Sequence, residues 1–103
     1  MRVERLDHLV LTVRDIPATV TFYTRVMGMQ AVTFGDNRWA LAFGRQKINL
    51  HQAGREFEPK ADHPTPGSAD QCFITADPIE DVVAGLRAEG VPVIEDPVRR
   101  TGA

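Results

Sequence analysis

The sequence predicts an α+β fold made of two βαβββ modules, the second of which is incomplete. Three observations lead to this prediction. A strand with period-two alternation runs directly into an amphipathic helix, three more strand patterns follow that helix, and the strand-then-helix order starts again after a proline- and glycine-rich loop. The 103 residues suit a single domain, which we divide into module one (5–53), a linker loop (54–68) and a partial module two (69–103).

The first strand is expected over Leu6–Val13. Because side chains alternate along a strand, Leu9, Leu11 and Val13 form one row and His8, Val10 and Thr12 the other. A helix would cover the first row. His8 then lies on the concave side of the sheet.

The helix is expected over Asp15–Gly28. Asp15 can cap the first amides, Pro17 suits the first turn, and Gly28 can take the left-handed position at the end. The apolar residues follow the three-and-four spacing of a core-facing stripe: Ile16, Val20, Tyr23, Val26 and Met27.

Three strands are expected next, over Met29–Phe34, Arg38–Phe43 and Gln46–Gln52, with turn residues after the first of them. In the second, Trp39 alternates with the apolar residues of the core, or it forms a wall of a ligand cavity.

The last of these strands ends in a second histidine. Ile48 and Leu50 make its aliphatic row, whereas Asn49 and His51 share the other face. The sequence therefore predicts that His51 enters the same cavity as His8.

The second half repeats the first. After the loop Ala53–Ser68, which can cover the cavity and carries the exposed His63, a strand is expected over Asp70–Thr75. A helix entered through Asp77-Pro78 and ended by Gly90 repeats the Asp15-to-Gly28 spacing, and a strand starts at Val91–Ile94. The last two strands are missing, so we expect the natural chain to continue beyond Ala103 or a partner chain to supply them.

Composition excludes several functions. The net charge of −2 provides no basic footprint for nucleic acid, and no stretch approaches the length of a membrane span. We therefore expect a cytoplasmic protein. The one cysteine, Cys72, is interpreted as a small core residue and not as a nucleophile.

Three segments carry a resemblance to a known family: DHLVLTVRDIPATVTFYTRVMGM, KINLHQAGREFEPKA and DPVRRTGA. With the repeated module they resemble the vicinal oxygen chelate superfamily, in its single-domain glyoxalase-like branch. Its members include glyoxalase I, extradiol dioxygenases and the bleomycin-resistance proteins. The resemblance implies that paired modules curl into an open, barrel-like mixed sheet around a divalent metal ion, often across a homodimer.

The resemblance also implies ligand positions. His8 matches the first-strand ligand, and Asn49 aligns with the glutamate of glyoxalase I, which argues against that activity. His51, on the same face, could take over, and the ligand of module two aligns with Gln71 or, in another register, with Asp70. A final-strand glutamate would fall beyond Ala103.

Two hypotheses follow. The first is a metal-dependent lyase, isomerase or dioxygenase in which His8 and His51 hold Fe, Mn, Ni or Zn and a small substrate chelates the ion through its oxygens. The alternative is a metal-free small-molecule binding protein of the bleomycin-resistance type. Asn49, Gln71, Thr12 and Trp39 are expected to line the cavity in either case.

Overall fold

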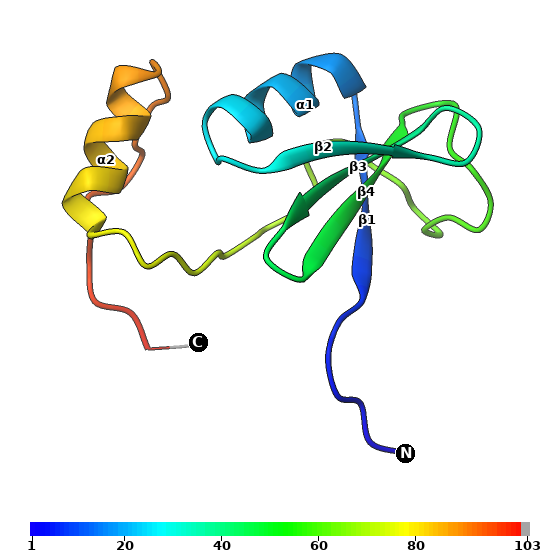
Figure 1. The fold of residues 1–103 in the computed structure, drawn as a ribbon, viewed down its shortest axis with the longest axis horizontal. Helices are drawn as coiled ribbons and strands as arrows, with labels where there is room; N and C mark the ends of the chain where they lie inside the picture. The colour runs from blue at the N-terminus through cyan, green and yellow to red at the C-terminus, as the bar shows by residue number, and fades with distance from the viewer. Residues whose placement is uncertain (102–103) are drawn as a thin grey trace. The chain divides into compact units, whose positions relative to one another are not determined.

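The computed structural model describes residues 1–101 and forms two compact units, Met1–Gln71 and the residues from Cys72 onward. Each unit is considered by itself. The elements in chain order are β1 (His8–Val13), α1 (Ile16–Arg25), β2 (Gln30–Phe34), β3 (Arg38–Phe43), β4 (Gln46–Gln52) and α2 (Ile79–Ala88) (Figure 1).

The first unit is a complete βαβββ module. Its four strands form one curved, unclosed sheet in the order β1-β4-β3-β2, in which β1 runs parallel to β4 and the other neighbours are antiparallel. Helix α1 lies across one face of this sheet (Figure 1). The predicted α+β class and the element order of module one are confirmed.

Helix α1 begins directly after its capping residue, Asp15. The Asp15 side chain accepts a hydrogen bond from the Ala18 amide at 2.9 Å, which satisfies one of the amides that the first turn leaves unpaired. After the helix, Gly28 has φ +70°, a conformation that costs glycine no steric strain. The chain then turns back into β2.

The core lies between α1 and the sheet. Leu41 of β3 and Ile48 and Leu50 of β4 are at most 1% exposed. The register places Leu41 beside Ile48, and Leu11 of β1 beside Leu50, so one continuous aliphatic row faces the helix. Burial of each such side chain stabilises the fold by about 1.5–3 kcal/mol.

The second unit contains helix α2 but not the two predicted strands. Residues 70–75 and 91–94 form no strand within the described part of the chain, so those two predictions are wrong for this structure. A strand pattern becomes a strand only when a neighbouring strand pairs with it, and the described sheet contains β1 to β4 alone. For the same reason Cys72, predicted to be buried, is exposed.

The entry into α2 also differs from the prediction. Pro78 occupies the capping position, and no side chain hydrogen-bonds to the first turn. In the first module the order is Asp-Ile-Pro, whereas here proline follows Asp77 directly. Asp77 is thereby moved one residue away from the place at which Asp15 caps. Gly90 does match Gly28, with φ +74°.

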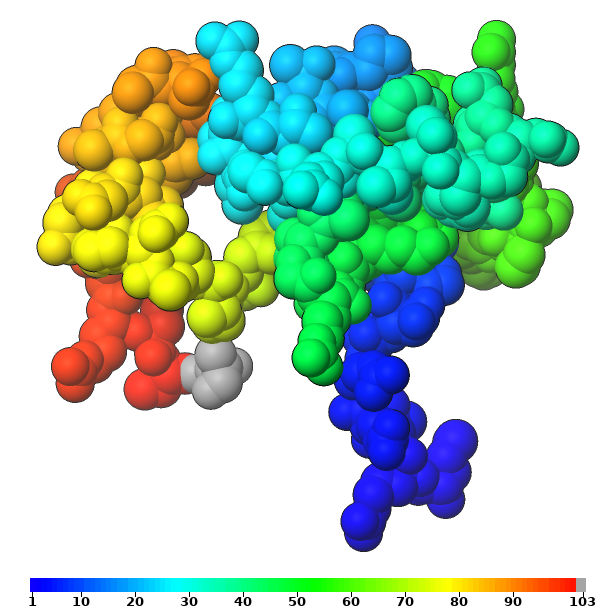
Figure 2. Space-filling view, viewed as in Figure 1, coloured from blue at the N-terminus to red at the C-terminus, as the bar shows by residue number. Residues whose placement is uncertain are grey.

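Before β1 the chain runs as an arm of exposed side chains, residues 1–7, which projects from the sheet (Figure 2). Among the helices described, none is both long and apolar enough to cross a membrane.

Candidate functional site

A row of polar side chains lies on the face of the sheet opposite to α1, which we call the open face. The parallel register pairs His8 with Lys47, Val10 with Asn49 and Thr12 with His51. Paired residues of neighbouring strands share a face. His8, Asn49 and His51 therefore all belong to the open face, as strand alternation predicts.

Asn49 and His51 are buried without hydrogen-bond partners. Asn49 is 6% exposed and His51 only 1%. Within residues 1–101, no group pairs with Asn49 Oδ1 or with either ring nitrogen of His51. Buried polar atoms are nearly always paired, and leaving one unpaired costs about 1–3 kcal/mol. The three unpaired atoms belong to two residues of β4 that lie on the same face, so this part of the open face lowers the stability of the fold.

The surroundings of His51 keep its ring neutral. Phe57, from the loop after β4, packs edge-on against the imidazole with ring centroids 5.9 Å apart. Burial, and next the positive charge of Arg38, hold the pKa of His51 below its ordinary value, against the opposing charges of Glu56 and Glu58. A neutral imidazole retains a free lone pair, which a metal ion or a hydrogen-bond donor can use.

His8 stands at the exposed start of β1. Its Nδ1 lies 2.7 Å from a carboxylate oxygen of Asp7, whose pKa is lowered chiefly by the hydrogen bond from His8. A carboxylate on one ring nitrogen orients an imidazole and leaves the other nitrogen available, an arrangement common behind metal ligands.

The two histidines are far apart for ligands of one ion. Four register positions separate them, which is about 13 Å of strand. Asn49 lies between the two histidines, two register positions or about 7 Å along the strand from the position of each. The described residues contain no group of three or more His, Cys, Asp or Glu side chains placed to hold a metal ion. Asn49 with one neighbouring histidine is thus the compact donor pair.

Two cations on the open face were missed by sequence reasoning. The Arg38 guanidinium lies 5.1 Å from the ring centroid of Phe34 and 4.7 Å from that of Phe57, and the Lys47 ammonium lies 4.6 Å from that of Phe34. Alternation could have revealed Arg38, because it is out of phase with Trp39 and therefore shares the face of Ala40 and Asn49.

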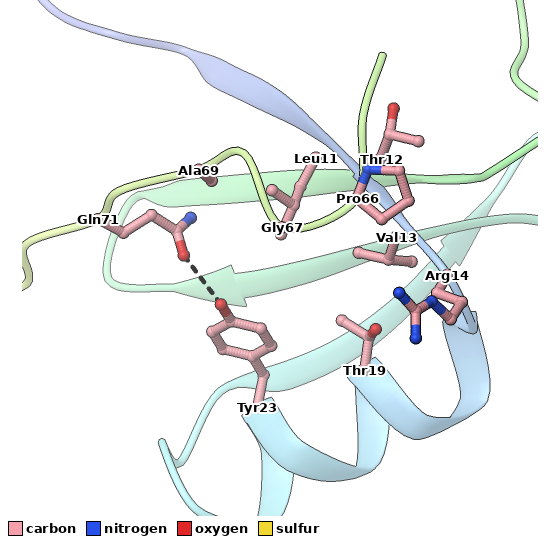
Figure 3. A pocket seen from close by; sticks show the side chains of 10 residues that line it. All are labelled: Leu11, Thr12, Val13, Arg14, Thr19, Tyr23, Pro66, Gly67, Ala69 and Gln71. Atoms are coloured by element: carbon pink, nitrogen blue, oxygen red, sulfur yellow. Dashed lines mark hydrogen bonds between the residues drawn. The ribbon is translucent and has the colours of Figure 1, made fainter. Parts of the chain in front are cut away.

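A cavity of about 400 Å³ runs along the free edge of β1 (Figure 3). Two of the residues expected to line a cavity, Thr12 and Gln71, line this one, and Asp70 is exposed. Gln71 does not join His8 or His51. Its Oε1 accepts a hydrogen bond of 2.8 Å from the Tyr23 hydroxyl of α1, whose pKa is raised by burial (Figure 3).

Trp39 lines a different cavity. This one, of about 530 Å³, lies on the α1 side of the sheet, between the start of the helix, the start of β3 and the end of β4. Phe57 contributes to its wall and also contacts His51. The predicted cavity-lining residues are therefore divided between two cavities and the open face.

Comparison with known proteins identifies close relatives. The chain is 61% identical over 103 residues to virulence protein STM3117 of Salmonella typhimurium, covering all of this chain and 72% of that protein. It is 55% identical over 103 residues to the glyoxalase domain-containing protein RDO1 of Mycosarcoma maydis, of which it spans 58%.

Solved structures share the fold. The crystal structure of STM3117 superposes with a TM-score of 0.97 over 100% of this chain and 82% of that chain. At 22% identity, lactoylglutathione lyase from Agrobacterium tumefaciens superposes with a TM-score of 0.68 over 92% of this chain and 77% of its own. At 17% identity, the antibiotic-binding protein TnmS3 from Streptomyces sp. CB03234 superposes with a TM-score of 0.66 over 87% of this chain and 74% of its own. The last two support the fold alone.

The family model described as the Glyoxalase/Bleomycin resistance protein/Dioxygenase superfamily matches residues 5–103. Because the match covers nearly the whole chain and the βαβββ module is present in the structure, the chain belongs to this superfamily.

Proposed function

We propose that the chain is part of a metal-dependent enzyme that acts on a small oxygen-chelating substrate, with the open face as its site. One observation carries the proposal: the buried polar atoms of Asn49 and His51 lack partners within residues 1–101. A bound ion and substrate would satisfy them. Without a ligand, the fold bears a cost that an apolar pair would avoid.

The donor set fits a divalent first-row ion in part. One imidazole nitrogen and one amide oxygen are ligands that such ions accept, and a neutral His51 needs no proton removed before it binds. His8, oriented by Asp7, is the alternative imidazole for an ion bound at Asn49, because it lies too far from His51 to share one ion with it. A chelating substrate contributes two oxygens of its own, so a partial protein site suffices to hold the ternary complex.

The ion would supply Lewis acidity to the chelated substrate. This chain's residues would orient the substrate and exclude water around it. Phe57 covers His51 on one side, and Ala40, fully buried beside Asn49 on the neighbouring strand, adds only a methyl group to this face. Fe, Mn, Ni and Zn all suit imidazole and oxygen donors.

Metal binding to matched histidine variants tests the proposal. Isothermal titration with Zn²⁺ is expected to give one site in the wild type, weakened at least about tenfold in His51→Ala and in Asn49→Leu, as loss of a ligand predicts. His63→Ala is the control, because the side chain of His63 is 90% exposed on the loop. Equal affinities in all four proteins would contradict the proposal.

A second candidate is a metal-free binding protein. The observation that favours it is Asn49, a neutral amide, at the position where glyoxalase I carries a glutamate ligand. In that case a small molecule would hydrogen-bond directly to Asn49 and His51. Zn²⁺ would then show no saturable site, while His51→Ala would still lose the small molecule.

Homodimer formation stays a prediction. In the described sheet β1 is an edge strand, so another strand can pair with it. Sedimentation at micromolar concentration should give twice the monomer mass, and a monomer mass would contradict the prediction.

A further inference from the structure

We infer that the open face selects an anionic ligand, and that Arg38 and Lys47 are the residues that recognise its negative oxygen group. This rests on the proposed function in one respect: it assigns a substrate class, an organic acid or phosphoryl compound, to the same face.

Arg38 is held in place by aromatic rings. Its guanidinium packs on Phe34 at 5.1 Å and on Phe57 at 4.7 Å from the centroids. A cation–π contact attracts a guanidinium to the ring face but uses none of its five N–H donors. Such a group is oriented in advance for a carboxylate or phosphate and loses little side-chain entropy on binding.

Lys47 reaches the same ring from another strand. It follows Gln46 at the start of β4, and its ammonium lies 4.6 Å from the Phe34 centroid. Phe34 thus brings together two cations from β3 and β4. In the absence of a ligand, like charges that share one ring repel each other, and an anion between them relieves the repulsion.

Neither cation is held in an ion pair within the described residues, although the Asp7 carboxylate interacts electrostatically with Lys47, and Glu56 and Glu58 act on His51 against Arg38. Arg38 and Lys47 form no ion pair with any carboxylate of residues 1–101, whereas other cations such as Lys60, Arg87 and Arg100 do. Arg38 acts electrostatically on His51, so it lies near the buried ring whose two nitrogens have no hydrogen-bond partner within the described residues. A built site therefore exists: two positive groups at its rim and a 1% exposed imidazole on its floor.

Oxalate, inorganic phosphate and catechol are suitable probes. All three present oxygens, but catechol is neutral at pH 7. We expect oxalate or phosphate, added without metal to the full chain, to shift the amide NMR signals of Asn49 and His51. Arg38→Gln and Lys47→Gln should each weaken that binding about tenfold, the effect of losing one charge-assisted hydrogen bond. Salt should weaken it in the wild type.

Two further variants separate charge from packing. Arg45→Gln, on the exposed turn between β3 and β4, is the matched control and should bind like the wild type. Arg38→Lys keeps the charge and should recover part of the affinity lost in Arg38→Gln. Preference for oxalate over phosphate would identify a carboxylate site, and the reverse preference a phosphoryl site.

The outcomes that overturn the inference are distinct from those that overturn the proposed function. Equal oxalate and phosphate binding by Arg38→Gln, Lys47→Gln and Arg45→Gln, or no binding by the wild type at tens of millimolar of either anion, would refute anion recognition. Such results would leave Zn²⁺ binding intact. Anion binding by a protein that takes up no Zn²⁺ would support the inference and refute the metal proposal.

Discussion

The imidazole of His51 meets the ring of Phe57 edge-on, with centroids 5.9 Å apart and ring planes at 68°. This contact shields one side of a histidine whose two nitrogens have no partner among the described residues. Packing and polarity therefore conflict at one residue. Such conflicts are retained in natural proteins mainly where a ligand resolves them.

Replacing His51 should stabilise the protein. We expect His51→Leu to raise the free energy of unfolding by about 1 kcal/mol or more, because it removes two unpaired buried nitrogens and keeps apolar contact with Phe57. Urea unfolding at pH 7 measures this. His63→Leu on the exposed loop should change stability by less than about 0.5 kcal/mol. A destabilised His51→Leu would indicate that a bonded structural histidine had been removed.

The same residue should make stability depend on pH. The folded-state pKa of His51 lies below its ordinary value of 6.5, so the unfolded chain binds the proton more readily. The contribution of the neutral His51 to the free energy of unfolding is complete above pH 6.5 and is lost as the pH falls toward the folded-state pKa. The pKa values of Asp7 and Glu56 lie below 3.8 and 4.5, so the stability that these two carboxylates contribute is lost only at lower pH.

Urea unfolding curves recorded from pH 7.5 to 5 should therefore show different pH dependence in the wild type and in the His51→Leu variant. The wild type loses stability on acidification over this range, and the His51→Leu variant loses less. Parallel pH dependence in both would contradict a neutral, buried His51.

The two helix entries should respond differently to the same substitution. Asp15→Ala removes a cap bond to the Ala18 amide and should cost about 1 kcal/mol of stability. Asp77→Ala removes no cap bond, because Pro78 holds the capping position, and should cost much less. Thermal unfolding of both variants checks the difference, and equal losses would contradict the assigned caps.

The cavity beside β1 should loosen when its hydrogen bond is removed. Tyr23→Phe deletes the bond to Gln71 but keeps the ring, so we expect a loss of about 0.5–1.5 kcal/mol. Amide hydrogen exchange should become faster in residues 66–71 and stay unchanged in β3. Unchanged exchange near Gln71 would show that this bond does not hold the segment.

Much of module one could be predicted because its signals are local. Alternation predicted the correct faces of His8, Asn49 and His51, and Asp15 marked the start of the first helix. The helix ends at Arg25, earlier than the predicted Gly28, which instead takes its left-handed conformation in the turn that follows. Strand formation at residues 70–75 could not be judged in this way, because it depends on a distant partner that no local pattern reveals.

The site was less predictable than the fold. Alternation says which face a residue takes but not the register between strands, and the parallel pairing of β1 with β4 is what separates His8 from His51 by four positions. The convergence of Arg38 and Lys47 on Phe34 likewise arises from three strands together. The sequence pattern of a single strand does not predict that convergence.

The most direct test of the open-face site is the NMR signal of the His51 ring nitrogens during titration with Zn²⁺. We expect one of the two ¹⁵N signals to shift at an equimolar ratio, with the Asn49 side-chain amide shifting in step and His63 unaffected. Ring signals of His51 that stay unchanged at saturating Zn²⁺ would contradict the claim that its unpaired nitrogens serve a metal ion.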